Sequence, residues 1–125
     1  MELKFYICEN CGNIVAKIKD SGVPVMCCGQ KMTEIKTGTT DAAVEKHVPV
    51  VTRLEECIYK VEVGSVPHPM LPEHHIAFIY VETEHGGIRV DLKEKPEAVV
   101  CVCNEKPIAV YEYCNLHGLW KTDLS

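Results

Sequence analysis

The first 36 residues contain four of the chain's eight cysteines but too short a sequence to bury a hydrophobic core of their own. Cys8 and Cys11 form a C-x-x-C motif followed by glycine, and Cys27 and Cys28 follow downstream. Two sulfurs on one tight turn face a single cation, and a second pair completes a four-thiolate site of the kind that tetrahedral zinc or iron occupies. In so short a segment the metal would replace the missing core. The spacing leaves iron and zinc open.

The second cysteine pair differs from that of an ordinary zinc ribbon because Cys27 and Cys28 are adjacent. Neighbouring residues tend to point in different directions. Placing both sulfurs on one ion is therefore expected to distort the tetrahedron.

Length, charge and termini limit the function classes. The 125 residues allow one ordinary domain, or a small domain joined to one of about 90 residues. A net charge of −5 without any basic run argues against nucleic-acid binding. The sequence has neither a signal peptide nor an apolar run long enough to span a membrane, which predicts a cytoplasmic protein. Disulfides are rare there, so the cysteines are expected to be metal ligands, reactive groups or buried thiols rather than cystines.

The region after residue 36 is expected to be almost entirely β. Residues 33–43 are small, polar and without periodicity, and they are interpreted as a linker. A hairpin turn is expected at residues 84–87, and the fold class is mainly β, with an immunoglobulin-like sandwich following the small metal-binding domain. Apolar and β-branched runs predict strands at 48–52, 57–63, 75–81, 88–92, 98–103 and 108–113.

A second candidate metal site lies in this region. Cys114 and His117 are three residues apart where a strand enters a turn, so sulfur and nitrogen can reach one ion from a single loop. His47, His68 and His74 lie upstream on predicted loops. Four imidazoles and one thiolate exceed what tetrahedral zinc needs and suit a five-coordinate redox metal with an open sixth position. The alternative is that these are unrelated loop histidines.

The two remaining histidines are not expected to join this site. His74 and His75 are consecutive in an extended segment and would point to opposite faces, so only one of them can serve a given site. His85 falls in the predicted hairpin turn and is expected to be solvated.

Taken together, these motifs resemble the desulfoferrodoxins, the two-iron superoxide reductases. The resemblance covers essentially the whole chain, and the motifs occur in the family's order. They are Cys8-x-x-Cys11 with Cys27-Cys28, Glu45-Lys46-His47, His68-Pro69-Met70 followed by His74, and Cys114-Asn115-Leu116-His117-Gly118.

The resemblance implies two iron centres in two domains. It implies a desulforedoxin-like domain, residues 1–36, with ferric iron on Cys8, Cys11, Cys27 and Cys28. It implies an immunoglobulin-like catalytic domain, residues 37–125, whose iron has His47, His68, His74 and His117 as equatorial ligands and Cys114 as the axial ligand.

The same resemblance implies the activity and its partners. Superoxide would be reduced to hydrogen peroxide without release of oxygen, as antioxidant defence, in a homodimer supplied with electrons by a rubredoxin-type donor. Glu45 can ligate the oxidised iron, and Lys46 lies beside the open position. Neither a nucleic acid nor a membrane is expected as a partner.

Three cysteines are not part of the family motif. These are Cys57, Cys101 and Cys103. Cys101 and Cys103 are two residues apart, so in a strand they would share one face of the sheet, and they are expected to be core thiols.

Two readings from other classes remain open. A cupredoxin-like electron carrier also builds a thiolate–histidine site on a β-sandwich, but the chain lacks a methionine shortly after His117 and that reading leaves two histidines unused. A zinc-ribbon interaction module would bind zinc and a protein partner. The visible spectrum and the metal content distinguish these readings from an iron enzyme.

Overall fold

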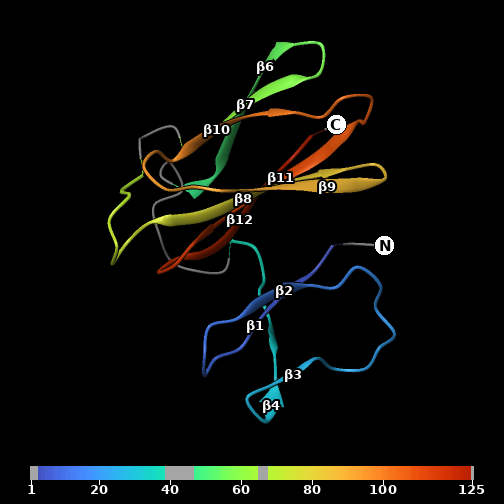
Figure 1. The fold of residues 1–125 in the computed structure, drawn as a ribbon, viewed down its shortest axis with the longest axis vertical. Helices are drawn as coiled ribbons and strands as arrows, with labels where there is room; N and C mark the ends of the chain where they lie inside the picture. Colours follow the sequence, from blue (N-terminus) through green and yellow to red (C-terminus); the bar gives the residue numbers. More distant parts are fainter. Residues whose placement is uncertain (1–2, 39–46, 65–67, 125) are drawn as a thin grey trace. The chain divides into compact units, whose positions relative to one another are not determined.

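The computed structural model divides the chain into two compact units, Met1–Lys36 (unit 1) and Thr37–Ser125 (unit 2). It describes residues 3–38, 47–64 and 68–124. The elements of the described residues are strands, which confirms the mainly β class (Figure 1). Within them, no helix is long and apolar enough to cross a membrane.

Unit 1 is a pair of very small sheets. Strand β1 (Phe5–Ile7) pairs antiparallel with both β2 (Ile14–Ala16) and β5 (Thr33–Glu34). Strands β3 (Met26–Cys27) and β4 (Gln30–Lys31) form a hairpin joined by two residues.

Few side chains of unit 1 are buried. Within residues 3–36, the fully buried ones are Phe5, Cys8 and Met32. This is too small a core to hold the unit by hydrophobic burial, as its length predicted.

The interpretation of residues 33–43 as a linker is wrong for its first part. Thr33 and Glu34 form β5, because their backbone completes the open edge of β1. Thr37 bridges Leu119, and the Gly38 amide donates to the Leu119 carbonyl over 2.8 Å. Residues 39–43 lie outside the described residues.

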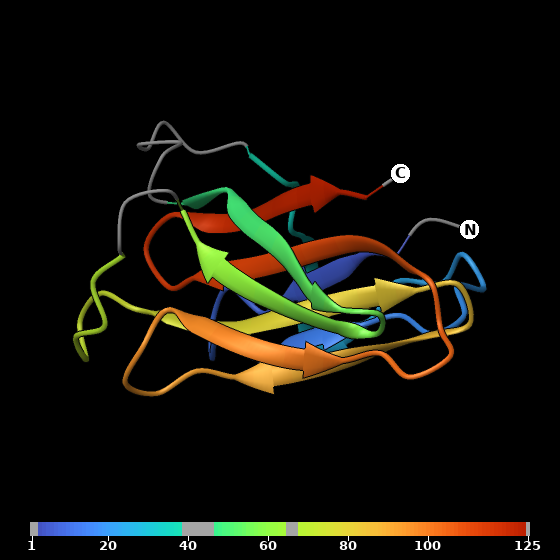
Figure 2. The ribbon, with the colours of Figure 1, turned by 90° about the horizontal axis from the view of Figure 1, so that it is seen from above.

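Unit 2 is a sandwich of two antiparallel sheets, as the sequence predicted (Figures 1 and 2). One sheet has the order β10-β7-β6 and the other the order β12-β11-β8-β9. The strands are β6 (Pro49–Glu55), β7 (Ile58–Val63), β8 (Ile76–Thr83), β9 (Gly86–Asp91), β10 (Glu97–Cys101), β11 (Pro107–Cys114) and β12 (Gly118–Asp123).

The core of unit 2 arises from alternation along these strands. In β8, Ile79 and Val81 are buried and Tyr80 between them is only partly buried. In β7, Val61 and Val63 point the same way from the opposing sheet, and all four belong to one hydrophobic cluster. Two inner faces with a period of two thus bury branched side chains between the layers.

The last strand was not predicted. Strand β12 pairs with β11 from Cys114↔Gly118 to Ala109↔Asp123. Gly118 has φ 83°, a conformation that favours glycine, and it allows the chain to turn back directly after His117.

The ends of the strands decide where the candidate ligands lie. The start of β6 is level with the end of β7, since Pro49 pairs with Val63. The start of β8 is level with the end of β11, since Cys114 pairs with Ile76. The Thr122 hydroxyl donates to the Pro49 carbonyl over 2.6 Å and ties β12 to the start of β6. Loops that are far apart in sequence therefore meet at one end of the sandwich.

Candidate metal centres

Two groups of side chains bring their ligand atoms together, each with all of these atoms within 4.8 Å of one another. One consists of His47, His68, His74, Cys114 and His117, and the other of Cys8, Cys11, Cys27 and Cys28. Every side chain predicted as a metal ligand from the cysteine and histidine motifs lies in one of these groups.

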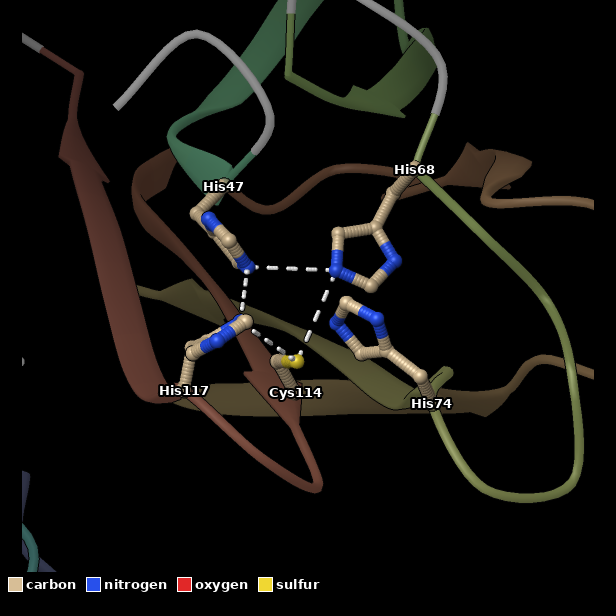
Figure 3. A group of neighbouring side chains, drawn as sticks. All are labelled: His47, His68, His74, Cys114 and His117. Carbon is tan, nitrogen blue, oxygen red and sulfur yellow. Dashed lines mark hydrogen bonds between the residues drawn. The ribbon is translucent and has the colours of Figure 1, made fainter. Parts of the chain in front are cut away.

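The four histidines of unit 2 form a closed ring of imidazoles (Figure 3). Neighbouring rings meet edge to face, with centroids 4.6–4.9 Å apart and planes at 73–84°. The order around the ring is His47, His68, His74, His117. This arrangement directs four nitrogens at one common space, as four ligands in one plane require.

The fifth group is the Cys114 sulfur. Its Sγ lies 3.5 Å from His68 Nε2 and 3.7 Å from His117 Nδ1, and the side chain is completely buried. Burial raises the pKa of the Cys114 thiol, while the backbone amides of Leu116 and His117 act in the opposite direction. These amides belong to the turn itself, so the Cys-x-x-His loop supplies both ligands and the dipoles that favour a thiolate.

Backbone and ring contacts fix the orientation of the imidazoles. His68 Nδ1 lies 2.7 Å from the Pro69 carbonyl and must donate to it, which leaves Nε2 as a lone pair facing the common space. Burial lowers the pKa of His68 to about 4, so the ring is neutral at neutral pH. A neutral imidazole is the form that binds a metal.

Trp120 supports two of the ligands, and the sequence reasoning missed it. Its indole stacks on the His47 ring, with centroids 5.1 Å apart and an angle of 21°. Its Nε1 donates to the His117 carbonyl over 3.1 Å. The available signal was the chain's single tryptophan, which follows the Cys-x-x-His-Gly motif two residues after Gly118.

The donor set fits a cation. His47 Nε2 is 3.1 Å from both His68 Nε2 and His117 Nδ1. A single proton on His47 can satisfy one of these nitrogens and not both, so at least one pair of lone pairs faces each other. A metal ion in the common space would bind all of them, and mixed imidazole and thiolate ligands suit a transition metal.

The thiolate group of unit 1 lies between two turns. Cys11 Sγ is 3.7 Å from Cys27 Sγ, and the Asn13 side-chain amide donates to Cys27 Sγ over 3.6 Å. The Cys11 amide lowers the pKa of the Cys8 thiol to about 6, whereas the Cys8 and Cys11 thiols raise that of Cys27 to about 12. Four sulfurs this close would repel one another as thiolates, and a cation between them relieves that repulsion.

The adjacent pair Cys27-Cys28 is accommodated by the backbone. Cys28 and Gly29 are the two turn residues of the β3–β4 hairpin, with φ of 52° and 74°. Positive φ at both turn positions is the geometry of the two-residue hairpin and swings Cys28 Sγ back toward Cys27 Sγ. A left-handed conformation at Cys28 thus lets two adjacent cysteines belong to one ligand group.

Histidines outside the ring lie where the pattern predicted. His75 Nδ1 contacts the Leu71 carbonyl at 3.0 Å, and its side chain is not in the metal-binding group. The His85 side chain is 76% exposed and pairs with Glu105 at 3.2 Å. Glu45 is the predicted sixth ligand of the oxidised iron, and Lys46 is the predicted cation beside the open position. Both lie outside the described residues.

The prediction that Cys101 and Cys103 are core thiols is wrong. Cys101 and Cys103 are exposed and Cys57 is half-buried. The strand ends at Cys101, and Cys103 has φ 54° in the following turn, so the two do not share a face within the sheet.

Fold and site together define a class: an all-β metalloprotein with a four-thiolate centre in a small unit and an imidazole–thiolate centre at the end of a β-sandwich. The desulfoferrodoxin family model matches residues 39–123, and the chain belongs to this family. The resemblance drawn from the motifs is thereby confirmed.

Similar proteins extend over almost the whole chain. The desulfoferrodoxin of Nitratidesulfovibrio vulgaris is 43% identical over 124 residues, which are 98% of this chain and 97% of that protein. The crystal structure of the superoxide reductase from Treponema pallidum has a TM-score of 0.82 and 35% identity, covering 98% of this chain and 100% of that one. The superoxide reductase of Pyrococcus abyssi is 38% identical over 109 residues, covering 72% of this chain and 93% of that protein.

Proposed function

We propose that this chain is a superoxide reductase, an oxidoreductase that adds one electron and two protons to superoxide, giving hydrogen peroxide without releasing oxygen. The observation that carries the proposal is the convergence of five ligand atoms from widely separated loops within 4.8 Å. The names of the relatives from Pyrococcus abyssi and Treponema pallidum support the same reaction.

The imidazole–thiolate group is proposed to hold the catalytic iron, and the four cysteines of unit 1 a second iron. In this assignment His47, His68, His74, His117 and Cys114 would hold the catalytic iron through four neutral imidazoles and one thiolate. Residues 1–36 then form the desulforedoxin-like domain and residues 37–125 the catalytic domain. Iron held by the second domain would supply the electron and a vacant position for superoxide.

The side chains around the site have separate tasks. The Leu116 and His117 amides stabilise the Cys114 thiolate, and the His68–Pro69 hydrogen bond keeps the His68 lone pair directed inward. The net charge of −5 would repel superoxide, so attraction has to be local. Lys46, next to His47 in sequence, is proposed as the cation that attracts the anion and orients a proton-donating water, and Glu45 as a sixth ligand after oxidation.

Reaction and metal content test the proposal together. Iron-loaded, reduced protein is mixed with superoxide in a stopped-flow instrument, and the peroxide yield is measured with the oxygen released. One peroxide per superoxide and no oxygen are expected, with two irons per chain. Release of oxygen, zinc in both sites, or the spectrum of blue copper would reject it.

A matched pair of variants ties the activity to the geometry. His74→Ala removes a member of the imidazole ring, whereas His75→Ala removes its neighbour, whose Nδ1 contacts the Leu71 carbonyl instead. The first variant is expected to lose iron from unit 2 and the reaction, and the second to keep both. Equal effects would mean that the ring does not define the site.

Cellular context follows from the family resemblance and also belongs to the proposal. The protein is proposed to act in the cytoplasm as a homodimer that receives electrons from a rubredoxin-type donor. Sedimentation of the iron-loaded protein tests the dimer, and reduction of the catalytic iron by purified rubredoxin tests the donor.

A further inference from the structure

The three cysteines outside both metal-binding groups lie close together at one end of the β10-β7-β6 sheet of unit 2. Cys57 is in the β6–β7 turn, Cys101 is the last residue of β10, and Cys103 is in the turn that follows. The Sγ atoms of Cys57 and Cys101 are 3.6 Å apart, and those of Cys101 and Cys103 are 3.9 Å apart. The Val102 amide donates to the Cys57 carbonyl over 2.9 Å and holds the two segments together.

This cluster is distinct from the imidazole–thiolate centre. Strand β10 ends beside the beginning of β7, since Cys101 pairs with Ile58. The histidine loops adjoin the other end of β7, where Val63 pairs with Pro49. The three thiols therefore lie at the opposite end of the β10-β7-β6 sheet from His47.

Cys101 has the features of an attacking thiol. Its side chain is exposed, and the Cys103 amide together with the Cys57 and Cys103 thiols holds its pKa below the usual value. The Cys57 and Cys103 thiols have raised pKa values, chiefly because each lies beside Cys101. A thiolate flanked by two thiols at van der Waals distance is the arrangement of a reactive cysteine with a resolving partner.

The distances favour a reaction between pairs of sulfurs over the binding of a metal. In the part of the chain that the structure describes, the groups that could hold an ion have all ligand atoms within 4.8 Å of one another, and these three cysteines are not such a group. Cys101 touches each neighbour separately. An S–S bond of about 2.05 Å requires the Cys57 and Cys101 sulfurs to approach from 3.6 Å.

We infer that Cys57 and Cys101 form a peroxide-reducing dithiol, in which Cys101 is the nucleophile and Cys57 the resolving thiol. The Cys101 thiolate attacks one oxygen of the peroxide, the O–O bond breaks, and the leaving hydroxide takes up a proton to become water. Cys101 is then a sulfenic acid. The Cys57 sulfur attacks it, the S–O bond breaks, and a second water leaves as the disulfide forms. Two thiols have lost two electrons, and one peroxide has become two waters.

The peroxide can come from the proposed function, on which this part of the inference rests. A superoxide reductase releases hydrogen peroxide, and a thiol pair on the same chain with an exposed nucleophile, Cys101, would consume some of it. The thiol reaction itself takes any small peroxide, so adding peroxide from outside tests it independently of superoxide turnover.

The experiment uses the full iron-loaded chain, treated with stoichiometric hydrogen peroxide, alkylated and cleaved after glutamate. Cys57 is then in the fragment 57–62, Cys101 and Cys103 share 98–105, and Cys114 is in a separate fragment after Glu112. A peptide joining 57–62 to 98–105 is expected, and reduction with dithiothreitol should separate it. Fragmentation should place the bond at Cys101. Complete absence of this peptide, or a bond from Cys57 to Cys103 instead, would overturn the inference.

Three single variants give the controls. Cys57→Ser and Cys101→Ser are each expected to lose the cross-linked peptide, and Cys103→Ser to keep it. All three should retain two irons and the parent rate of superoxide capture, because the cluster is remote from the imidazole ring. If Cys101→Ser still consumes peroxide as the parent chain does, the nucleophile has been assigned wrongly. Failure of the superoxide assay with an intact cross-link would reject the proposed function and leave the dithiol standing.

Discussion

Trp120 is the side chain whose removal should separate metal binding from folding most clearly. It is 6% exposed, stacks on the His47 ring and donates to the His117 carbonyl over 3.1 Å. In Trp120→Phe an aromatic ring remains beside His47, but the hydrogen bond is lost. One net hydrogen bond is worth about 1 kcal/mol, which is about fivefold in an equilibrium constant.

The smaller ring adds a second cost. Removing a buried tryptophan or phenylalanine side chain entirely costs about 3–5 kcal/mol, so shortening an indole to a phenyl should cost about 1–2 kcal/mol. We therefore expect unit 2 to lose about 2–3 kcal/mol of stability in total. Of these two losses, only the lost hydrogen bond to the His117 carbonyl acts on the loop that carries this ligand. Iron affinity should therefore fall by about fivefold to tenfold, at the lower end of the effect of residues that orient metal ligands.

Two measurements on the same preparations separate these effects. Urea unfolding gives the change in stability, and competition with a chelator of known affinity gives the change in iron binding. Leu116→Ser is the matched control, since Leu116 lies in the same turn but is 58% exposed, and it should change neither. If Trp120→Phe lowers the stability as expected while iron binds as tightly as before, Trp120 supports only the sheet and the reasoning is refuted.

Three further predictions test other parts of the molecule. Lys46→Ala should slow superoxide capture by up to about tenfold and flatten its dependence on ionic strength, with the iron still bound. Glu45→Ala should scarcely change capture. An unchanged second-order rate for the lysine variant would remove Lys46 from the mechanism. Gly29 has φ 74°, so Gly29→Ala should lower the stability of the β3–β4 turn by about 1–2 kcal/mol and speed the loss of metal from unit 1. The visible absorption of the metal centre measures this loss. Metal retention equal to that of the parent chain would show that the alanine is not strained in this turn. Because its pKa is lowered, Cys101 should be a thiolate at lower pH than Cys57, so its alkylation by iodoacetamide should begin at lower pH; the reverse order in peptide mapping would contradict this.

Most of the fold could be predicted because its determinants are local. Apolar and β-branched runs identified the strands that carry Val61, Ile79 and Val110, and each of these is buried. Strand β12 was missed because it starts at Gly118 and has little alternation of its own. It forms because β11 offers it an open edge over six pairs of residues.

The parts that could not be predicted depend on tertiary context. Thr33 and Glu34 have no strand signal, and they become β5 because β1 needs a second neighbour. The spacing of Cys101 and Cys103 indicated a shared sheet face, yet the strand stops between them and Cys103 turns outward. A period of two applies only while the strand continues, and the end of a strand is the least predictable part of it.

The motifs and their resemblance to the desulfoferrodoxins gave the ligands of unit 2 before the geometry was known. Chain topology, rather than sequence distance, explains why these residues meet. His47 precedes β6, His74 precedes β8, and Cys114 ends β11. In an antiparallel sandwich the start of one strand adjoins the end of its neighbour, so loops separated by many residues share one end. The same rule places the β6–β7 turn and the end of β10 together at the other end, with Cys57 beside Cys101. A sandwich that brings five ligands together at one end also brings another set of loops together at the opposite end. In this chain that second set of loops contains thiols.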